Sequence, residues 1–179
     1  MKTILTDEQV SDALERLYDT VLAEIPADGP IAVIGIRTRG EVLARRMVAR
    51  LAVDRPDRAV HFGVLDITFY RDDLGRRQGA PLVRATEIPV ALDDMWVLLV
   101  DDVLQTGRSV RAALDALRDF GRPSVVRLAV LLDRGGRELP IAADMVGQTV
   151  HIPDHSRVHV KLKESDGEEG VFIVKQTQA

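Results

Sequence analysis

The sequence predicts an α/β fold built on a doubly wound parallel sheet, and three observations support this prediction. Short apolar runs, typical of buried parallel strands, occupy residues 31–36, 96–100 and 125–132. Amphipathic segments separate them, with Gly- and Pro-containing breaks between the elements. Right-handed crossovers then place helices on both faces of the sheet. Ligands of such folds bind beyond the carboxyl ends of the strands, so we expect a site there.

The N-terminal part predicts a helix, a strand and a second helix. Thr6 and Gln9 form a capping-box pattern, and apolar residues recur from Val10 to Ile25 at the spacing of one helical face. The apolar strand at 31–36 follows, and we expect the next helix from about 41 to 51. These elements form the first strand–helix unit of the sheet.

A flexible antiparallel loop is expected in the middle of the chain. Residues 60–70 are rich in β-branched and aromatic side chains, which favours a strand, and 83–88 are predicted to return antiparallel to it. The polar stretch 71–81 between them is a candidate mobile lid. A helix is then predicted over 108–120, where Gly121 and the following residues end it.

The C-terminal part predicts a hairpin, from apolar residues at 158–162 and 171–174 on either side of a polar turn. Neither an internal repeat nor a flexible linker is apparent in the sequence, so we expect one domain over residues 1–179. His151, His155 and His159 recur at four-residue spacing, but a strand-and-loop context would not bring them to one face, and we predict no metal site from them.

Composition excludes several classes of chemistry. The chain has no cysteine, which excludes disulfides, a thiolate nucleophile and a cysteine zinc site. A net charge of −4 argues against a protein coated with basic residues for non-specific nucleic-acid binding. The sequence shows neither a leader pattern nor an apolar run of membrane-spanning length, so we expect a soluble, cytoplasmic protein.

The motif that carries chemistry starts at the end of the strand 96–100. Two carboxylates, Asp101 and Asp102, follow this strand, and a small-residue turn then leads into the next helix. Hydroxyls and backbone amides at a helix N-terminus favour a bound phosphate, and Gly107 lets the backbone approach it. The carboxylates can accept hydrogen bonds from vicinal hydroxyls one sugar length away. The pattern therefore fits a ribose 5-phosphate, whereas an isolated Asp-Asp pair would more simply be solvated or bind magnesium in another nucleotide fold.

This motif resembles the signature of type I phosphoribosyltransferases for phosphoribosyl pyrophosphate (PRPP). Residues 35–40 resemble the pyrophosphate loop of that superfamily, 65–74 its approach to the flexible loop, and 129–141 a small hood that closes over the base. Together these segments resemble the family of bifunctional pyrimidine-operon regulators and uracil phosphoribosyltransferases. The resemblance extends from the first predicted helix to the final hairpin.

The resemblance implies conversion of uracil and PRPP to UMP and pyrophosphate, with Mg²⁺ bound mainly through PRPP rather than through protein ligands. It assigns Asp101, Asp102 and Arg39 as catalytic residues. The implied PRPP and nucleotide contacts are Thr38, Arg39, Gly40, Asp101, Asp102, Val103, Leu104, Gln105, Thr106, Gly107, Arg108 and Ser109. Flexible-loop residues are Arg71, Asp72 and Asp73, and the base-binding hood contributes Asp133, Arg134 and Arg137. A homodimer or higher homo-oligomer is also implied.

Four positions shape the choice of acceptor and partner. Some superfamily members carry an acid where this chain has Gln105, which argues against a purine acceptor. Gly136 replaces a histidine of the family pattern, and Ala142 and Gln148 replace basic residues on the surface associated with leader RNA. Two alternatives therefore stay open: an RNA-binding attenuation regulator whose pocket senses nucleotides with weak catalysis, and a phosphoribosyltransferase for another base.

Overall fold

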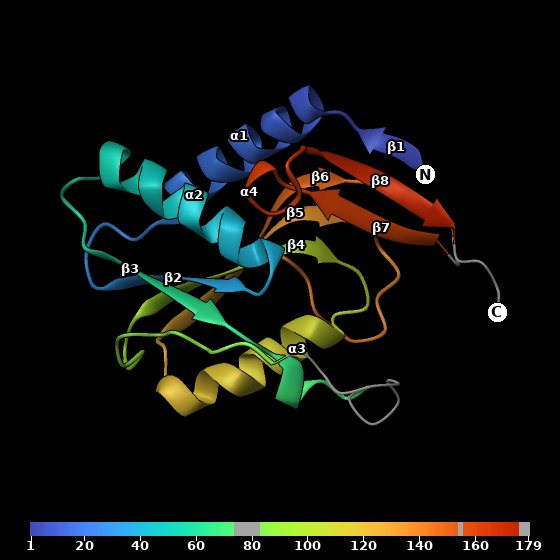
Figure 1. Ribbon diagram of the computed structural model, residues 1–179. Helices are drawn as coiled ribbons and strands as arrows, with labels where there is room; N and C mark the ends of the chain where they lie inside the picture. The colour runs from blue at the N-terminus through green and yellow to red at the C-terminus, as the bar shows by residue number, and fades with distance from the viewer. Residues whose placement is uncertain (74–82, 154–155, 176–179) are drawn as a thin grey trace.

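The computed structural model describes residues 1–73, 83–153 and 156–175, which form two sheets and the helices around them (Figure 1). The larger sheet has five parallel strands in the order β3-β2-β4-β5-β6. Its strands are β2 (Ile31–Ile36), β3 (Val60–Leu65), β4 (Trp96–Leu104), β5 (Val125–Asp133) and β6 (Met145–Thr149). This confirms the predicted α/β fold class.

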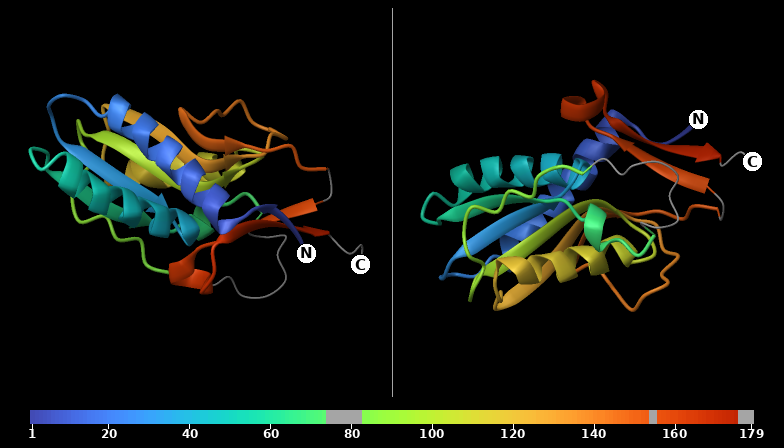
Figure 2. Two further views of the ribbon diagram at one scale, coloured as in Figure 1. Left: turned by 90° about the horizontal axis from the view of Figure 1, so that it is seen from above. Right: turned by 60° about the horizontal axis from the view of Figure 1, so that its bottom comes forward.

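Helices cover both faces of this sheet. Helix α1 (Asp7–Glu24) and helix α2 (Arg39–Asp54) lie over one face, and α3 (Arg108–Leu117) covers the other (Figures 1 and 2). Alternate residues of β4 divide between the two cores: Leu98 packs with the residues of α1 and α2, while Leu99 packs with those of α3. Every residue of β2 is buried, as expected for a central parallel strand.

The first helix begins as its sequence predicts. Thr6 Oγ1 accepts a hydrogen bond from Gln9 N at 3.4 Å, and Gln9 Oε1 accepts one from Thr6 N at 2.9 Å. This reciprocal pair satisfies two donors that the first turn of a helix leaves without partners. The second helix starts earlier than expected, at Arg39, and therefore includes two residues of the predicted pyrophosphate loop.

A second, three-stranded antiparallel sheet, which we call the small sheet, stands beside the first (Figure 2, right). Its order is β1-β8-β7, with β1 (Lys2–Leu5), β7 (Ser156–Lys161) and β8 (Gly170–Lys175). The predicted C-terminal hairpin is confirmed, and the short helix α4 (Lys163–Asp166) joins its strands. Sequence analysis missed β1, β6 and α4, which are too short to show a clear period.

Three predictions in the middle of the chain need correction. The strand expected over 60–70 ends at Leu65, and a 3-10 turn, η1 (Thr68–Tyr70), follows it. Residues 83–88 form no continuous strand: a single bridge joins Val64 and Glu87, because Asp66 instead accepts the backbone N–H of Arg84 at 2.6 Å. The helix predicted to reach 120 ends at Leu117, with a 3-10 turn η3 (Arg118–Phe120) beyond it.

Part of the predicted loop and all of the predicted hood segment lie within the described residues. Most of the candidate lid, residues 74–81, lies outside the described residues. The segment 129–141 begins in β5, to which residues up to Asp133 belong, and continues as the loop after that strand. The small sheet is made from other residues, near the two chain ends.

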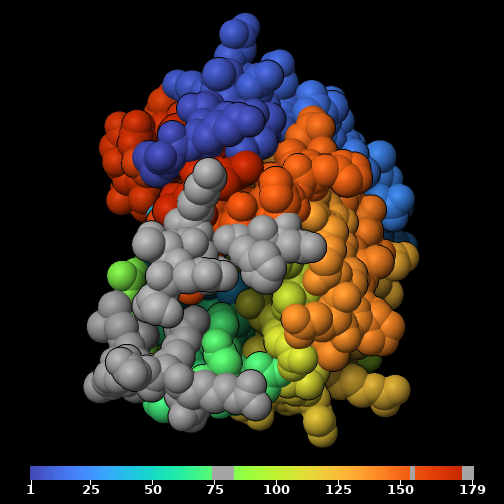
Figure 3. Space-filling model, turned by 90° about the vertical axis from the view of Figure 1, so that its right-hand side faces the viewer, coloured from blue at the N-terminus to red at the C-terminus, as the bar shows by residue number. Residues whose placement is uncertain are grey.

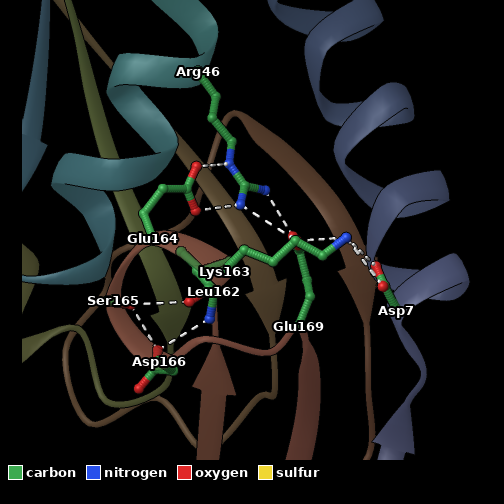
Figure 4. A network of polar contacts seen from close by, with 8 residues as sticks. All are labelled: Asp7, Arg46, Leu162, Lys163, Glu164, Ser165, Asp166 and Glu169. Carbon is green, nitrogen blue, oxygen red and sulfur yellow. Dashed lines mark hydrogen bonds and ion pairs between the residues drawn. The ribbon is translucent and has the colours of Figure 1, made fainter.

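Polar contacts attach the small sheet to α2 and α1 (Figure 4). Arg46 of α2 bonds Glu164 at 2.6 and 2.8 Å and Glu169 at 2.6 Å. Lys163 reaches Asp7 at 3.1 Å. The Glu169 side chain is only 6% exposed, so its pairing with Arg46 offsets a substantial desolvation cost.

Within the described residues, none of the helices is both long and apolar enough to cross a bilayer.

Candidate active site

The candidate site lies where the strand order changes direction, between β2 and β4. The chain leaves β2 towards β3 on one side and leaves β4 towards β5 on the other, which opens a crevice at the carboxyl ends of both strands. Two adjoining chambers occupy this region and share Arg71, Val103 and Ser109. We call them the α3 chamber and the α2 chamber after the helices that begin there.

The α3 chamber has a volume of about 540 Å³ and lies between the start of α3 and strand β7 of the small sheet. It is lined by Arg71, Asp72, Asp73, Val103, Leu104, Gln105, Thr106, Gly107, Arg108, Ser109, Val110, Arg134, Ser156, Arg157, Val158 and His159. Figure 3 shows this end of the molecule, where orange atoms from the second half of the chain lie beside yellow ones.

The α2 chamber is smaller, at about 370 Å³, and more polar. It is lined by Ile36, Arg37, Thr38, Arg39, Asp66, Ile67, Thr68, Arg71, Arg84, Asp101, Asp102, Val103 and Ser109. The structure therefore brings together, around two connected spaces, all the predicted contacts from residues 38–39 and 101–109. Gly40 lies beneath them, in contact with β4.

Both carboxylates of the motif belong to β4 itself rather than to a loop after it. Asp101 is 8% exposed, and its Oδ1 accepts the backbone N–H of Asp102 at 2.9 Å. Burial raises the pKa of the Asp101 carboxyl well above its ordinary value, and the neighbouring Asp102 charge adds to this. Burial also raises the pKa of Asp102, while Asp101 and Arg39 act in the opposite direction. The pair is therefore a concentrated negative charge that favours cations and hydroxyl donors.

The turn from β4 into α3 presents a helix N-terminus to the α3 chamber. Gly107 caps α3 with a φ of +88°, a left-handed conformation that glycine adopts without strain. A Cβ at this position would also lie 3.2 Å from Cβ of Ile141. Thr106 fixes the turn from its other side, because its carbonyl accepts the backbone N–H groups of Glu138 and Leu139, both at 3.0 Å. The Arg108 N–H donates to Thr106 Oγ1 at 3.3 Å, and the positive end of the α3 dipole at this turn favours an anion.

The turn from β2 into α2 packs directly on β4. A Cβ on Gly40 would lie 2.4 Å from the carbonyl oxygen of Val100, so only glycine fits there. The peptide between Arg37 and Thr38 is cis. Within the described residues, the Nε atoms of Arg37 and Arg39 are buried without a hydrogen-bond partner. Two unsatisfied cationic donors beside the α2 chamber fit an anionic ligand.

The predicted loop residues contact the start of α3. Asp72 accepts hydrogen bonds from Arg108 at 2.5 Å and from Arg111 at 2.6 Å. Hydrogen bonding to Arg108 is the main reason that the pKa of Asp72 lies below its ordinary value. Arg71 pairs with Asp73 at 2.8 Å and lines both chambers.

The predicted base-binding residues do not act as one group. Arg137 bonds the carbonyl oxygens of Gln105 at 2.9 Å and Ile141 at 2.8 Å and also pairs with Asp133, so its guanidinium holds the loop after β5 against the turn before α3. Neither Arg137 nor Asp133 lines the chambers described above. Arg134 does line the α3 chamber, and it donates to the carbonyl of Ser156 in β7 at 2.9 Å.

Sequence reasoning missed several lining residues. Ser156 to His159 enter the α3 chamber from β7, and His159 had been considered only as a metal ligand. Asp66, Thr68 and Arg84 line the α2 chamber. Although burial acts to raise the pKa of Asp66, hydrogen bonds from Thr68 and the Arg84 backbone lower it overall. A carboxylate followed two residues later by a threonine is an Asx-turn signal that would have identified this corner.

The donors present suit a cation held mainly by a ligand. Among the described residues, no group of three His, Cys, Asp or Glu side chains could hold a metal ion. Asp101 and Asp102 nevertheless place two carboxylates in the α2 chamber, and a divalent cation would offset the burial that raises the pKa of each. Mg²⁺ accepts such a site when substrate phosphates supply further oxygens.

Sequence comparison finds close relatives over nearly the whole chain. The model of the phosphoribosyl transferase domain family matches residues 2–165. The chain is 49% identical to a bifunctional protein PyrR of a Roseiflexus species over 178 residues, covering 98% of this chain and 96% of that protein. It is 48% identical to the bifunctional protein PyrR of Mycolicibacterium paratuberculosis, covering 96% and 92% respectively.

Structural comparison finds the same fold in more distant proteins. A hypoxanthine phosphoribosyltransferase of Trypanosoma cruzi superposes with a TM-score of 0.69 at 17% identity, covering 98% of this chain and 97% of that one. The corresponding values for a hypoxanthine phosphoribosyltransferase of Staphylococcus aureus are 0.66 and 18%, covering 94% and 90%. At such identities the likeness establishes the fold.

Proposed function

The chain belongs to the phosphoribosyl transferase domain family, among the bifunctional PyrR proteins, and on this premise we propose that it transfers the ribose 5-phosphate of PRPP to uracil. The observation that carries the proposal is the pair of connected chambers at the ends of β2 and β4. The α3 chamber contains a helix N-terminus, and the α2 chamber contains two buried arginine donors together with Asp101 and Asp102. This order of groups suits a sugar with phosphate groups at its two ends.

We assign the parts of PRPP accordingly. The 5-phosphate binds the amides and hydroxyls of Thr106 to Ser109, where the dipole of α3 favours negative charge. The ribose hydroxyls donate to Asp101 and Asp102. The diphosphate binds in the α2 chamber against Thr38 and Arg39, and the buried Nε donor of Arg39 lacks a partner there. Mg²⁺, when bound with PRPP near the two carboxylates, would neutralise part of the diphosphate charge.

The chemistry requires the chain to stabilise opposite charges close together. As the bond to the diphosphate breaks, positive charge develops at the ribose C1 and negative charge on the leaving group. The carboxylates of Asp101 and Asp102 stabilise the first, and Arg39 stabilises the second. Because these groups are fixed by β4 and by the start of α2, little reorganisation is needed in the transition state.

Uracil is the acceptor that the site supports best. It would enter the α3 chamber beside β7, where Val158 offers an apolar surface. Gln105 cannot take a proton from the ring of a purine, and Arg137 is already committed to backbone carbonyls. Arg137 therefore shapes the base site through the loop it holds, which revises its predicted direct contact with the base.

An acceptor panel tests this proposal. The purified chain, PRPP and Mg²⁺ are incubated with uracil, orotate, hypoxanthine, guanine or adenine, and nucleotide products are separated by chromatography. We expect UMP alone, at a rate that falls to background when Mg²⁺ is chelated. Formation of a purine nucleotide in preference to UMP would show that the acceptor assignment is wrong.

We further propose that the chain regulates pyrimidine genes by binding leader RNA in response to UMP, since its relatives are named as bifunctional. One feature bears on this: Gln148 stands where a basic residue was expected, and it accepts a hydrogen bond from Arg16 of α1 at 2.8 Å. A positive charge is therefore restored at this surface from another element. Gel-shift titration of a pyrimidine-operon leader should show tighter binding with UMP; equal binding with and without UMP would contradict the regulatory role.

The same proposal includes a single catalytic domain over residues 1–179, a cytoplasmic location, and assembly as a homodimer or larger homo-oligomer. Light scattering coupled to size-exclusion chromatography measures the assembly directly. A monomer mass near 19.8 kDa at micromolar concentration would contradict the oligomer.

A further inference from the structure

The short helix α4 contacts α2 through two arginines on one face of α2. Arg39 and Arg46 are seven residues apart, which places them about two turns apart on the same side of a helix. Arg46 pairs with Glu164 and Glu169 (Figure 4), and Arg39 pairs with Asp166, Nη2 to Oδ1, at 2.8 Å. The two contacts differ in one respect: Arg39 lines the α2 chamber and Arg46 does not.

Asp166 is itself fixed by the turn to which it belongs. Its Oδ2 accepts the backbone N–H of Leu162 at 3.0 Å and the hydroxyl of Ser165 at 2.6 Å (Figure 4). Oδ1 is the oxygen that receives Arg39. The carboxylate therefore joins a rigid turn of the small sheet to a guanidinium at the start of α2.

Asp166 uses only part of the Arg39 guanidinium. Asp166 receives one Nη2 donor, while Nε of Arg39 is buried and has no hydrogen-bond partner within the described part of the chain. Since a guanidinium carries five N–H donors in a planar fork, one edge can bind Asp166 while another binds an anion. A carboxylate that held Arg39 through two parallel bonds would compete with such an anion more strongly.

We propose that Asp166 is a positioning residue for Arg39, orienting this guanidinium towards the diphosphate of PRPP. The inference rests on the proposed function, because it needs a diphosphate in the α2 chamber. Anchoring of α4 alone does not require Asp166, since Arg46 already attaches this turn through Glu164 and the nearly buried Glu169. The small sheet thereby contributes to the leaving-group site without touching the substrate.

Two effects of removing the Asp166 charge oppose each other. Arg39 loses its orientation, which weakens diphosphate binding, but one negative charge near the diphosphate also disappears. We expect loss of orientation to dominate, because Oδ1 and Oδ2 are already neutralised by Arg39, Ser165 and the Leu162 amide. The remaining field on a ligand at the chamber is further screened by solvent and salt.

The test compares Asp166→Asn with Glu164→Gln, a matched change on the same helix whose partner, Arg46, lies outside the chamber. Asparagine keeps an oxygen for the Leu162 amide but cannot pair with Arg39 as an anion. Binding of PRPP, pyrophosphate and UMP, each with Mg²⁺, is measured by titration calorimetry. For Asp166→Asn we expect PRPP and pyrophosphate to bind roughly three- to tenfold more weakly and UMP to bind as in the wild type. For Glu164→Gln we expect all three affinities to be unchanged.

A third variant shows whether Asp166 acts through Arg39. In an Arg39→Gln background, Asp166→Asn should cause no further loss of pyrophosphate affinity, because the group that it positions is absent. A further loss of pyrophosphate affinity of the same size would overturn the inference. Equal weakening of UMP and pyrophosphate binding by Asp166→Asn alone would also overturn it, because it would indicate general damage to the site. Tighter pyrophosphate binding by Asp166→Asn would overturn the inference as well, because it would show that the pairing of Asp166 with Arg39 weakens diphosphate binding.

These outcomes separate the inference from the function on which it rests. If the wild-type chain binds PRPP and forms UMP but Asp166→Asn binds pyrophosphate normally, only the inference is wrong. If the wild-type chain binds neither PRPP nor pyrophosphate, the proposed function and this inference both fail.

Discussion

The central sheet and the small sheet differ in how far charged contacts supplement their apolar packing. The central sheet is buried between two apolar cores, and strand β2 has all of its residues buried. The small sheet packs Leu5, Val160, Leu162 and Val171 into the apolar core that it shares with α1 and α2, and carboxylates that pair with Arg39, Arg46 and Lys163 add polar contacts to this packing. The groups assigned to PRPP therefore stand on rigid elements, while the sheet beside the base site also depends on contacts that charge, pH and salt can alter.

The largest effect should follow a change on the central sheet. We expect Asp102→Asn to lower the rate of UMP formation by about 100-fold or more, because it removes a charge that stabilises the transition state. Melting temperature should change little. Initial rates at saturating substrates check this, with Asp115→Asn, an exposed position on α3, as the control. An Asp102→Asn enzyme with near-normal rate would remove this carboxylate from catalysis.

The next effect concerns attachment of the small sheet. Arg46→Met keeps the apolar stem but leaves the nearly buried Glu169 without its main partner, so we expect the free energy of unfolding to fall by about 2–3 kcal/mol. Urea denaturation measures this. The paired change Arg46→Met with Glu169→Met should recover most of the loss, since no charge is then buried alone. If Arg46→Met costs less than about 0.5 kcal/mol, the ion pairs do not attach the small sheet.

A smaller effect on stability, opposite in sign to that of Arg46→Met, is expected from a substitution at Asp101. Burial raises the pKa of this carboxyl in the folded protein. A carboxyl with a raised pKa contributes to stability at pH values below its unfolded pKa. That contribution is lost as the pH rises through the pKa of the folded state. At pH 7 burial of this carboxyl therefore lowers the free energy of unfolding. Asp101→Asn keeps an oxygen for the Asp102 amide and should raise the melting temperature by about 2–4 °C while lowering activity.

Scanning calorimetry at pH 7 tests the Asp101 prediction. A lower melting temperature for Asp101→Asn would show that interactions of the ionised carboxylate outweigh its burial. Near pH 4 the difference in melting temperature between the wild type and Asp101→Asn should be smaller, because the wild-type carboxyl is then largely protonated.

The smallest expected effect is the loss, at low pH, of the stability that the Asp166 carboxylate contributes. Burial acts to raise the pKa of this carboxyl, but hydrogen bonds from Ser165 and the Leu162 amide, together with Arg39, lower it from 3.8 to about 2. Its contribution to stability is thus complete above pH 3.8 and is lost as pH falls through about 2. The difference in melting temperature between wild type and Asp166→Asn should be constant from pH 7 to 5 and vanish towards pH 2. A difference that persists at pH 2 would contradict this origin.

The same contrast explains which features sequence could predict. Buried strands, the capping box at Thr6 and the turn at Gly107 depend on local residues, and these were predicted correctly. The pairing of Asp166 with Arg39 joins residues 127 positions apart and leaves no local pattern. Nor does sequence show that Arg137 is occupied by the carbonyls of Gln105 and Ile141, since those acceptors belong to every residue type.

Phosphorus NMR of one reaction tests the central claim most directly, because it follows both ends of PRPP at once. The chain, PRPP, uracil and Mg²⁺ are observed in a single tube. The account predicts that the PRPP signals decline while those of UMP and pyrophosphate rise together in equal amounts, and that neither product appears without uracil. Release of pyrophosphate without UMP, or unchanged PRPP in the presence of uracil, would contradict transfer to this base.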